Sequence, residues 1–293
     1  MTNESVDLVG SDRSQWDATL QLVFDRINGQ TKLSELAHKG PLYVQKPFYP
    51  EGQEYPHVYI LHPPGGIVSG DCLKVDIEVS KGASGLVTTP GATRFYRARE
   101  NEGVQTQITQ ILVREGASFE WFPMETIIYD GARVELSTKI NLASTSSVCV
   151  WDICCTGLPA SGQGFLDGRL DQKFMVFTES LPVFVDRLNL DENLKTFSAS
   201  NAGLRGAAVS GFMLLGPMDD GNDKDGMVLS LREVVEKEGL QSAASITALG
   251  KFFVGRYLGN SAFDARNIFC RWWEILRPGL LGKQAVWPRI WST

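Results

Sequence analysis

The sequence predicts a mainly β fold, arranged as a stacked, β-helix-like coil of many short strands with two helices in the C-terminal part. Strand-like segments recur about every ten to fifteen residues over roughly two hundred residues of the chain. The 29 glycines supply candidate corners between these segments. No convincing helical periodicity interrupts the strands, and this argues against a doubly wound α/β fold.

The predicted strands are recognised by their apolar patterns. Residues 16–24 alternate between apolar and polar side chains, as a half-buried strand does. The pair Asn28-Gly29 that follows is a hairpin signal. Further extended segments are predicted at residues 42–48, 58–61, 73–79, 86–89, 104–113, 134–142, 148–154, 174–177 and 183–185.

Two helices are predicted late in the chain, with a final strand at residues 251–257 between them. The segment 229–238 has apolar residues at helical spacing, and Gly239 follows it as a stop signal. The segment 262–277 also has apolar residues on one helical face. Pro278-Gly279 is expected to end this second helix.

The composition is that of an ordinary globular protein, with 43% apolar and 21% charged residues in 293. Residues 1–14 form a polar tail without the apolar segment of a secretory signal, so we expect a cytoplasmic protein. Residues 15–293 are expected to form a single β-rich domain. The odd number of cysteines, five, suggests free thiols and not a disulfide framework. No apolar run is long enough to span a membrane. The net charge of −6 disfavours nucleic-acid binding.

The C-terminal region combines positive charge with tryptophan. Residues 251–293 contain seven Lys or Arg residues, two carboxylates and four of the seven tryptophans. Arginine and tryptophan dominate protein–protein contacts, but a helix packed on the core uses the same residue types, and both interpretations stay open. The candidates for partner binding are Trp272, Trp273, Arg277, Arg289 and Trp291.

A corner with unusual backbone chemistry lies between the strands at 58–61 and 73–79. Pro63 and Pro64 fix the backbone and lack N–H donors, whereas Gly65 and Gly66 allow positive φ and close approach of other groups. Asp71 stands where the second of these strands begins. The corner is therefore either a tight structural turn or the edge of a site.

Motifs of common enzyme classes are missing from the sequence. There is no phosphate-binding loop, no nucleophile elbow, and no histidine or cysteine spacing of a closed metal site. Several carboxylates do lie beside glycines, prolines and aromatics, namely Asp71, Glu125, Asp130 and Asp186. Because oxygen ligands hold transition metals loosely, such a set could line a wet passage. Each carboxylate could equally cap a turn or pair with an arginine.

Seven stretches of the chain, in order, carry a resemblance to a known family: residues 40–48, 62–71, 88–97, 120–128, 186–188, 256–259 and 288–291. On these stretches the sequence resembles the urease accessory protein UreD family, also called UreH. Two positions depart from the expected pattern: Met124 stands where Gln is expected, and Leu158 stands where Arg is common.

The resemblance implies a non-catalytic scaffold with a nickel channel. Such a protein would form a hetero-oligomer with UreF and the GTPase UreG on apo-urease and pass Ni²⁺ toward the urease active site. It would hold no tightly bound cofactor, since GTP belongs to the partner GTPase. The channel-lining residues implied for this chain are first Asp71 and Asp186, and then Thr88, Thr89 and Glu125.

Two alternatives belong to other classes of protein. A carbohydrate-active enzyme could use Asp71 and Glu125 as paired carboxylates with Arg94 beside them. A binding module that pairs through a sheet edge would bind partners without any dependence on nickel.

Overall fold

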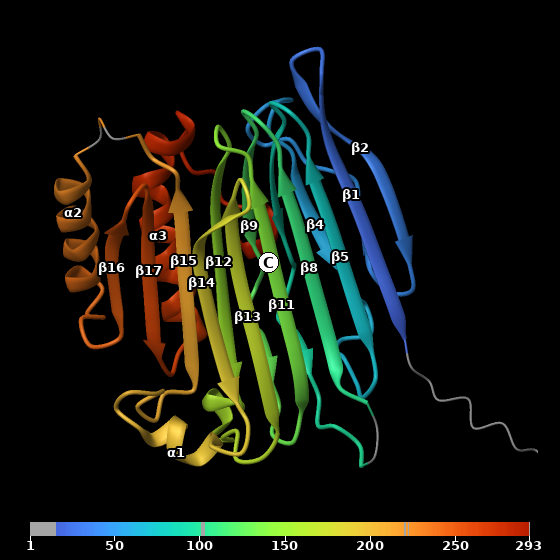
Figure 1. Cartoon of the computed structure of the whole chain (residues 1–293), viewed down its shortest axis with the longest axis vertical. Helices are drawn as coiled ribbons and strands as arrows, with labels where there is room; N and C mark the ends of the chain where they lie inside the picture. Colours follow the sequence, from blue (N-terminus) through green and yellow to red (C-terminus); the bar gives the residue numbers. More distant parts are fainter. Residues whose placement is uncertain (1–15, 101–102, 220, 222, 293) are drawn as a thin grey trace, which may run out of the picture.

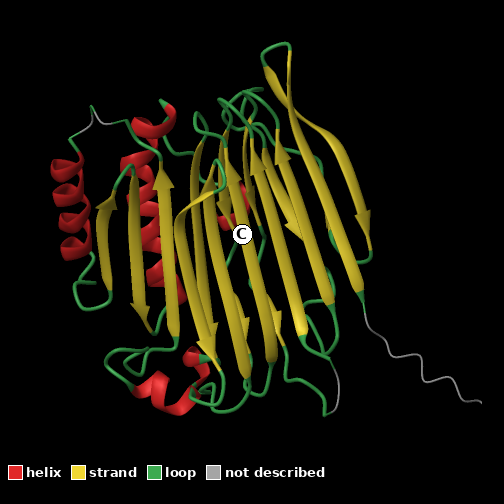
Figure 2. Ribbon diagram, viewed as in Figure 1, coloured by secondary structure: helices red, strands yellow, loops and turns green. Residues whose placement is uncertain are grey.

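The computed structural model describes residues 16–292, except 101, 102, 220 and 222 (Figure 1). The predicted tail at residues 1–14 lies outside the described residues. The prediction of a mainly β protein is confirmed, since the described residues form two stacked sheets with helices beside the second (Figure 2). Within the described part, no helix has the length and apolar character needed to cross a membrane.

The first sheet has the strand order β14-β13-β11-β8-β5-β1-β2 among the described residues. Its inner strands pair in parallel, and an antiparallel hairpin closes each edge. Its strands are β1 (Asp17–Ile27), β2 (Gln30–Lys39), β5 (Cys72–Val79), β8 (Gln105–Val113), β11 (Arg133–Leu142), β13 (Arg169–Thr178) and β14 (Leu181–Leu190).

The second sheet has the order β16-β17-β15-β12-β9-β6-β4-β3, with β10 and β7 attached beside β12. The pairs from β4 to β12 are parallel, whereas β15, β17 and β16 continue the sheet in antiparallel pairs. Its strands are β3 (Tyr43–Val44), β4 (His57–Leu61), β6 (Ser84–Thr88), β7 (Thr93–Phe95), β9 (Ser118–Phe122), β10 (Thr126–Ile128), β12 (Ser147–Thr156), β15 (Val209–Gly216), β16 (Ala244–Leu249) and β17 (Phe252–Gly259).

The predicted β-helix-like coil is not shown by the structure. The long strands of the central region do alternate between the two sheets along the chain, but the sheets are flat and mixed (Figure 1). Antiparallel hairpins at both ends of the first sheet, and the β15-β17-β16 meander in the second, interrupt any regular coil. The alternation of apolar side chains indicates which face of a strand is buried, but it does not determine which strand is the pairing partner or how the sheet curves.

The two predicted C-terminal helices are present as α2 (Lys224–Lys237) and α3 (Ala262–Leu281). A short helix, α1 (Leu194–Ala199), was not predicted, nor were the single 3₁₀ turns at Pro159–Ser161 and Arg289–Ser292. The expected stop at Pro278-Gly279 is wrong, because α3 continues to Leu281 and ends at Gly282. Gly282 adopts a φ of 65°, and its N–H donates to the Pro278 carbonyl, so the left-handed cap lies one turn later than predicted.

Two layers of apolar side chains hold these elements together. One layer fills the space between the two sheets, and the other lies between the second sheet and helices α2 and α3. Strand β12 contributes to both layers, since Cys154 faces the first and Cys155 the second. The first layer is the one that contains the candidate site.

Candidate functional site

Two cavities lie in the layer between the sheets and share one lining residue, Asp152. Cavity 1 has a volume of about 200 Å³ and cavity 2 a volume of about 210 Å³. The polar side chains of cavity 1 include His62, Thr89, Thr93, Arg94, Gln107, Thr126 and Thr138. Polar residues that line cavity 2 include Gln172, Asp186, Ser210 and Arg256. Arg187 and Tyr257 also border this cavity, but the Arg187 guanidinium pairs with Asp171 and the Tyr257 ring packs into the layer beneath the helices.

Asp152 occupies this position because of the alternation of β12. Val148, Val150 and Cys154 of the same strand point between the sheets, and Asp152 shares their parity. The strand is otherwise apolar and pairs with β9, β10 and β15, so it carries this one carboxylate into the interior of the molecule. Asp152 is partly exposed only because it faces the two cavities.

The surroundings of Asp152 favour its neutral form. Burial raises the pKa of the Asp152 carboxyl to about 7, a hydrogen bond with the Gln172 side chain lowers it, and the charge of Asp186 raises it further. Near neutral pH this carboxyl is therefore divided between its protonated and its charged form. A cation beside it would favour the charged form.

Asp186 and Thr89 are the two predicted channel residues that line these cavities. Asp186, on β14, lines cavity 2 and pairs with Arg256 of β17 at 2.7 Å. Thr89 lines cavity 1, and its hydroxyl accepts from the Met124 N–H at 2.9 Å and donates to the Gly91 carbonyl at 3.1 Å.

The other three predicted channel residues lie outside both linings in the described part of the chain, and their channel role stays a prediction. Asp71 is buried and accepts from the N–H groups of Trp16 and Val68, each at 3.0 Å. Thr88 is buried, and its hydroxyl donates to the Phe122 carbonyl. Glu125 is half-buried and lies 3.5 Å from Arg266.

The Pro63-Pro64-Gly65-Gly66 corner forms part of the wall of cavity 1. Gly65 adopts a φ of 79°, and both glycines line the cavity. The Tyr96 ring lies against Gly66, where any Cβ would overlap it, and the Tyr96 hydroxyl donates to the Gly65 carbonyl at 3.3 Å. The corner is thus a structural turn and the edge of a cavity at the same time.

Three of the five partner-binding candidates are core residues in this structure. Trp272, Trp273 and Arg277 are fully buried between α3 and the second sheet, so they offer no surface to a partner as placed here. Their positions on α3 explain this, since they lie on the face that covers β12, β15 and β17. Arg289 is exposed and Trp291 is partly exposed, so the surface prediction now depends on these two residues.

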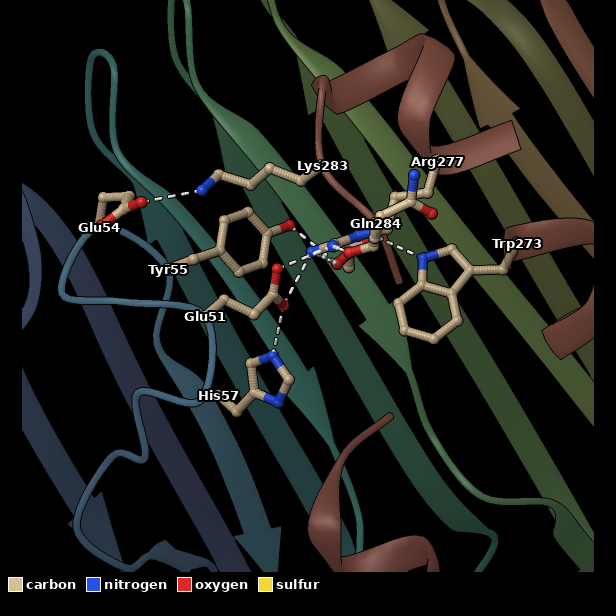
Figure 3. A network of polar contacts seen from close by, with 9 residues as sticks. Glu51, Glu54, Tyr55, His57, Trp273, Arg277, Lys283 and Gln284 are labelled. Carbon is tan, nitrogen blue, oxygen red and sulfur yellow. Dashed lines mark hydrogen bonds and ion pairs between the residues drawn. The ribbon is translucent and has the colours of Figure 1, made fainter. Parts of the chain in front are cut away.

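Arg277 is the centre of a buried polar network (Figure 3). It donates to Glu120 from Nε at 2.9 Å and from Nη2 at 3.0 Å, and to Glu51 from Nη1 at 2.8 Å. Glu120 also accepts from Trp273 Nε1 at 2.6 Å and from the Tyr55 hydroxyl at 2.9 Å. Burial tends to raise the pKa of Glu51, but hydrogen bonds with His57 and Arg277 outweigh it and lower that pKa.

This network joins the C-terminal part of the chain to the second sheet. Arg277 lies near the end of α3, Glu120 lies on β9, and Glu51 precedes β4. Beyond the helix, Trp291 Nε1 donates to the Thr88 hydroxyl at 3.0 Å. The core interpretation, one of the two that the sequence left open, therefore applies to Trp273 and Arg277 through the buried ion cluster, and Trp291 adds one indole hydrogen bond.

Sequence reasoning did not select Asp152 or Glu120. Both leave a signal in the sequence, since each is the only charged residue of a strand that is otherwise largely apolar. A charge inside such a strand must be paired or must face a polar space, because burial of an unpaired charge is costly. Glu120 is paired with Arg277, and Asp152 faces the cavities.

A stable metal centre is not found among the described residues, where no three His, Cys, Asp or Glu side chains gather in a group that could hold an ion. The available arrangement consists of single carboxylates, hydroxyls and amides along the cavities. Such a lining can contact a cation at one or two points at a time, and thus holds it weakly.

Comparison with known proteins identifies the family. Residues 17–292 match the family model described as UreD urease accessory protein. The chain is 39% identical over 285 residues to the urease accessory protein UreD of Marinomonas sp. (strain MWYL1), covering 96% of this chain and 91% of that one. It is 43% identical over 294 residues to that of Psychromonas ingrahamii, covering 96% and 95% of the two chains. With the UreD of Klebsiella aerogenes the identity is 35% over 278 residues, covering 95% and 97%. The resemblance predicted from the sequence is confirmed, and the chain belongs to the UreD urease accessory protein family.

Proposed function

We propose that this chain acts in urease maturation as a non-catalytic scaffold that conducts Ni²⁺ through cavities 1 and 2. Family membership supports the role in maturation. The position of Asp152 supports the conduction step most directly, because this one carboxylate lines both cavities. The two cavities then form successive parts of one passage between the sheets.

The lining fits an ion in transit. A cavity of about 200 Å³ has room for an ion and several water molecules, since about 10–15 Å³ is enough to hold one water. Oxygen and amide groups can replace part of the hydration shell of Ni²⁺, and the absence of a clustered site among the described residues keeps the affinity low. Weak binding is what passage requires, because a tightly held ion would not leave.

The proposed assembly is a cytoplasmic hetero-oligomer of this chain with UreF, UreG and the urease apoprotein. GTP binds to UreG in this scheme, and this chain holds nickel only in transit. The exposed Arg289 and the partly exposed Trp291, which follow the buried Arg277 network, are candidates for contact with one of these partners.

The enzyme alternative has little support from the geometry of its residues. Both Asp71 oxygens accept backbone N–H bonds, and Glu125 is paired with Arg266. Neither carboxylate is free to act as a general acid or base toward a substrate. The metal-independent binding module remains the rival of the nickel conduit. Only the conduit requires Asp152 for the delivery of nickel to urease.

The substitution Asp152→Asn tests the proposal, because it removes the charge and keeps the size and one acceptor oxygen of the side chain. The variant is co-expressed with UreF, UreG and the urease subunits, and the nickel content of the isolated urease is measured. Asp76→Asn is the matched control, since Asp76 lies on the outer face of β5.

We expect both variants to co-purify with the same partners in normal yield. Urease from the Asp152→Asn cells should contain several-fold less nickel than urease from the Asp76→Asn cells. Equal nickel contents, with complexes of equal yield, would contradict the conduction step and favour the metal-independent module.

A further inference from the structure

The ion pair between Arg256 and Asp186 connects the two sheets across cavity 2. Asp186 lies on β14, the edge strand of the first sheet, and Arg256 lies on β17 of the second. Arg256 Nη2 donates to Asp186 Oδ1 at 2.7 Å, and both residues line the cavity together with Asp152. Among the contacts between β14 and the second sheet, this one places a cation directly on a carboxylate of the proposed passage.

Arg256 is held only weakly in this position. Its side chain is 51% exposed, and that of Asp186 is 28% exposed. Exposed ion pairs contribute little to stability, and the contact of the guanidinium with the Phe184 ring, 5.9 Å from its centroid, adds little more. The guanidinium can therefore move into solvent at low cost, without disturbing the buried core.

A second arginine of cavity 2 has a different arrangement. Arg187 also lines the cavity, but its Nε and Nη2 donate to the two oxygens of Asp171 at 3.0 and 3.2 Å. Arg187 is thus committed to a carboxylate that does not line cavity 2, whereas Arg256 is paired with one that does. Of the two arginines, Arg256 is the one whose departure would free a carboxylate of the passage.

We propose that Arg256 is a releasable gate of cavity 2, whose guanidinium occupies the Asp186 carboxylate until a divalent cation replaces it. This inference rests on the proposed conduction of nickel and assigns its regulation to one residue. A divalent cation carries twice the charge of the guanidinium, so it competes favourably for the same oxygens once it reaches Asp186. In the absence of such a cation, the ion pair keeps the mouth closed and neutralises Asp186.

The first test measures access to the cavity and needs neither nickel nor urease. Ser210, which lines cavity 2, is replaced by cysteine in the full chain, and its modification by a cationic methanethiosulfonate reagent is followed by peptide mass spectrometry. Arg256→Gln is then added. Arg114→Gln is the matched control, because Arg114 pairs with Glu78 at 2.8 Å and is 47% exposed but lines neither cavity.

We expect Arg256→Gln to raise the rate of modification at position 210 at least fivefold, and Arg114→Gln to leave it unchanged. Asp186→Asn breaks the same ion pair from the other side and should also raise the rate, so the test does not depend on one variant folding. Unchanged rates in both Arg256→Gln and Asp186→Asn, with circular dichroism like that of the parent, would overturn the gate.

The second test distinguishes a gate from a simple structural link between the sheets. Binding of NiCl₂ to the full chain is measured by calorimetry. If Arg256 occupies the cation position, Arg256→Gln should strengthen nickel binding at least fivefold, whereas Asp186→Asn should weaken it. If the ion pair is only a structural link, both variants should change the affinity for nickel in the same direction, and that result would overturn the proposal. Nickel conduction is tested separately by Asp152→Asn, so the failure of either idea can be recognised.

Discussion

Asp152 differs from Asp71, Glu120 and Glu125 because no structural partner in the described part of the chain accounts for its charge. Asp71 caps backbone groups, Glu120 belongs to an ion cluster, and Glu125 faces an arginine, so each has a structural partner. Asp152 has a hydrogen bond with Gln172, but among the described residues no cation contributes to its pKa shift. A carboxylate kept in this state reduces the stability of the protein when it is charged, and the proposed conduction of nickel would account for its presence.

The pH dependence of stability tests this interpretation. Burial raises the pKa of Asp152 in the folded state from the ordinary value of 3.8 to about 7, so between these pH values the folded state holds this proton and the unfolded state does not. The contribution of this group to stability is therefore largest below pH 3.8 and is lost as the pH rises through 7.

We expect Asp152→Asn to unfold at higher urea concentration than the parent at pH 8. The gain in free energy of unfolding should be at most about 4 kcal/mol, which is the cost of the pKa difference at about 1.4 kcal/mol for each pH unit. At pH 4 the two proteins should be nearly equal in stability. If the difference in free energy of unfolding between Asp152→Asn and the parent is the same at pH 4 and pH 8, ionisation of Asp152 does not destabilise the folded state, and the interpretation is wrong.

Asp71 gives a second prediction at the scale of the residue. Because its two oxygens accept the N–H groups of Trp16 and Val68, Asp71→Ala leaves two partly buried donors unsatisfied. We expect a loss of about 1–3 kcal/mol in the free energy of unfolding, measured with urea. Asp71→Asn, which keeps one acceptor, should lose less.

The sequence-based prediction for Asp71 is tested with the same two variants. If Asp71 has a channel role, both should assemble with the partner proteins and yield urease with reduced nickel. Assembly with a full nickel content would remove Asp71 from the passage and leave it as a structural residue.

At the scale of the element, the regular patterns predicted most of the fold. The alternation in β1, β5 and β11 gave correct strands, and helical spacing located α3 to within one turn of its end. Elements with weak patterns were missed, such as the polar hairpin strand β2 and the six-residue helix α1. Local periodicity is informative only where one face is buried, and most of β2 is exposed.

The prediction for α3 concerns its anchor, Arg277. Replacement of this arginine by methionine keeps an unbranched apolar stem but leaves Glu51 and Glu120 buried without the guanidinium. We expect Arg277→Met to lower the free energy of unfolding by about 3–5 kcal/mol, because a broken buried pair leaves an uncompensated charge.

Lys283→Met is the matched control for this substitution. Lys283 pairs with Glu54 at 2.8 Å, but its side chain is 34% exposed and that of Glu54 is 41% exposed. The control should leave the urea concentration at the midpoint of unfolding nearly unchanged, because an exposed ion pair contributes little to stability. Equal effects of the two substitutions in urea titrations would show that the Arg277 network does not anchor the helix.

At the scale of the whole molecule, the candidate site depends on contacts that no local pattern reveals. Asp186 and Arg256 are 70 residues apart and meet only because the edge of the first sheet lies over the second. The cavities likewise exist only where the two sheets face each other. The sequence could therefore suggest carboxylates such as Asp186, but not the two cavities that share Asp152 as a lining residue.

The pairing of the sheets also explains why a β-helix was the wrong expectation. The sequence shows strands that recur at short intervals, and a regular coil and a pair of mixed sheets both satisfy this pattern. The antiparallel additions β2, β14, β15, β16 and β17 decide between them. These strands widen both sheets, and β14 and β17 bring the Asp186–Arg256 pair into the lining of cavity 2.

The nickel content of urease matured with a blocked passage tests the central claim most directly. Thr138 on β11 lines cavity 1, and Thr138→Trp would fill part of it, whereas its neighbour Lys139 is exposed and Lys139→Trp serves as the control. With partner complexes of equal yield in both variants, we predict nickel-poor urease from Thr138→Trp cells and normally loaded urease from Lys139→Trp cells. Fully loaded urease from the Thr138→Trp cells would contradict the claim that Ni²⁺ passes between the two sheets.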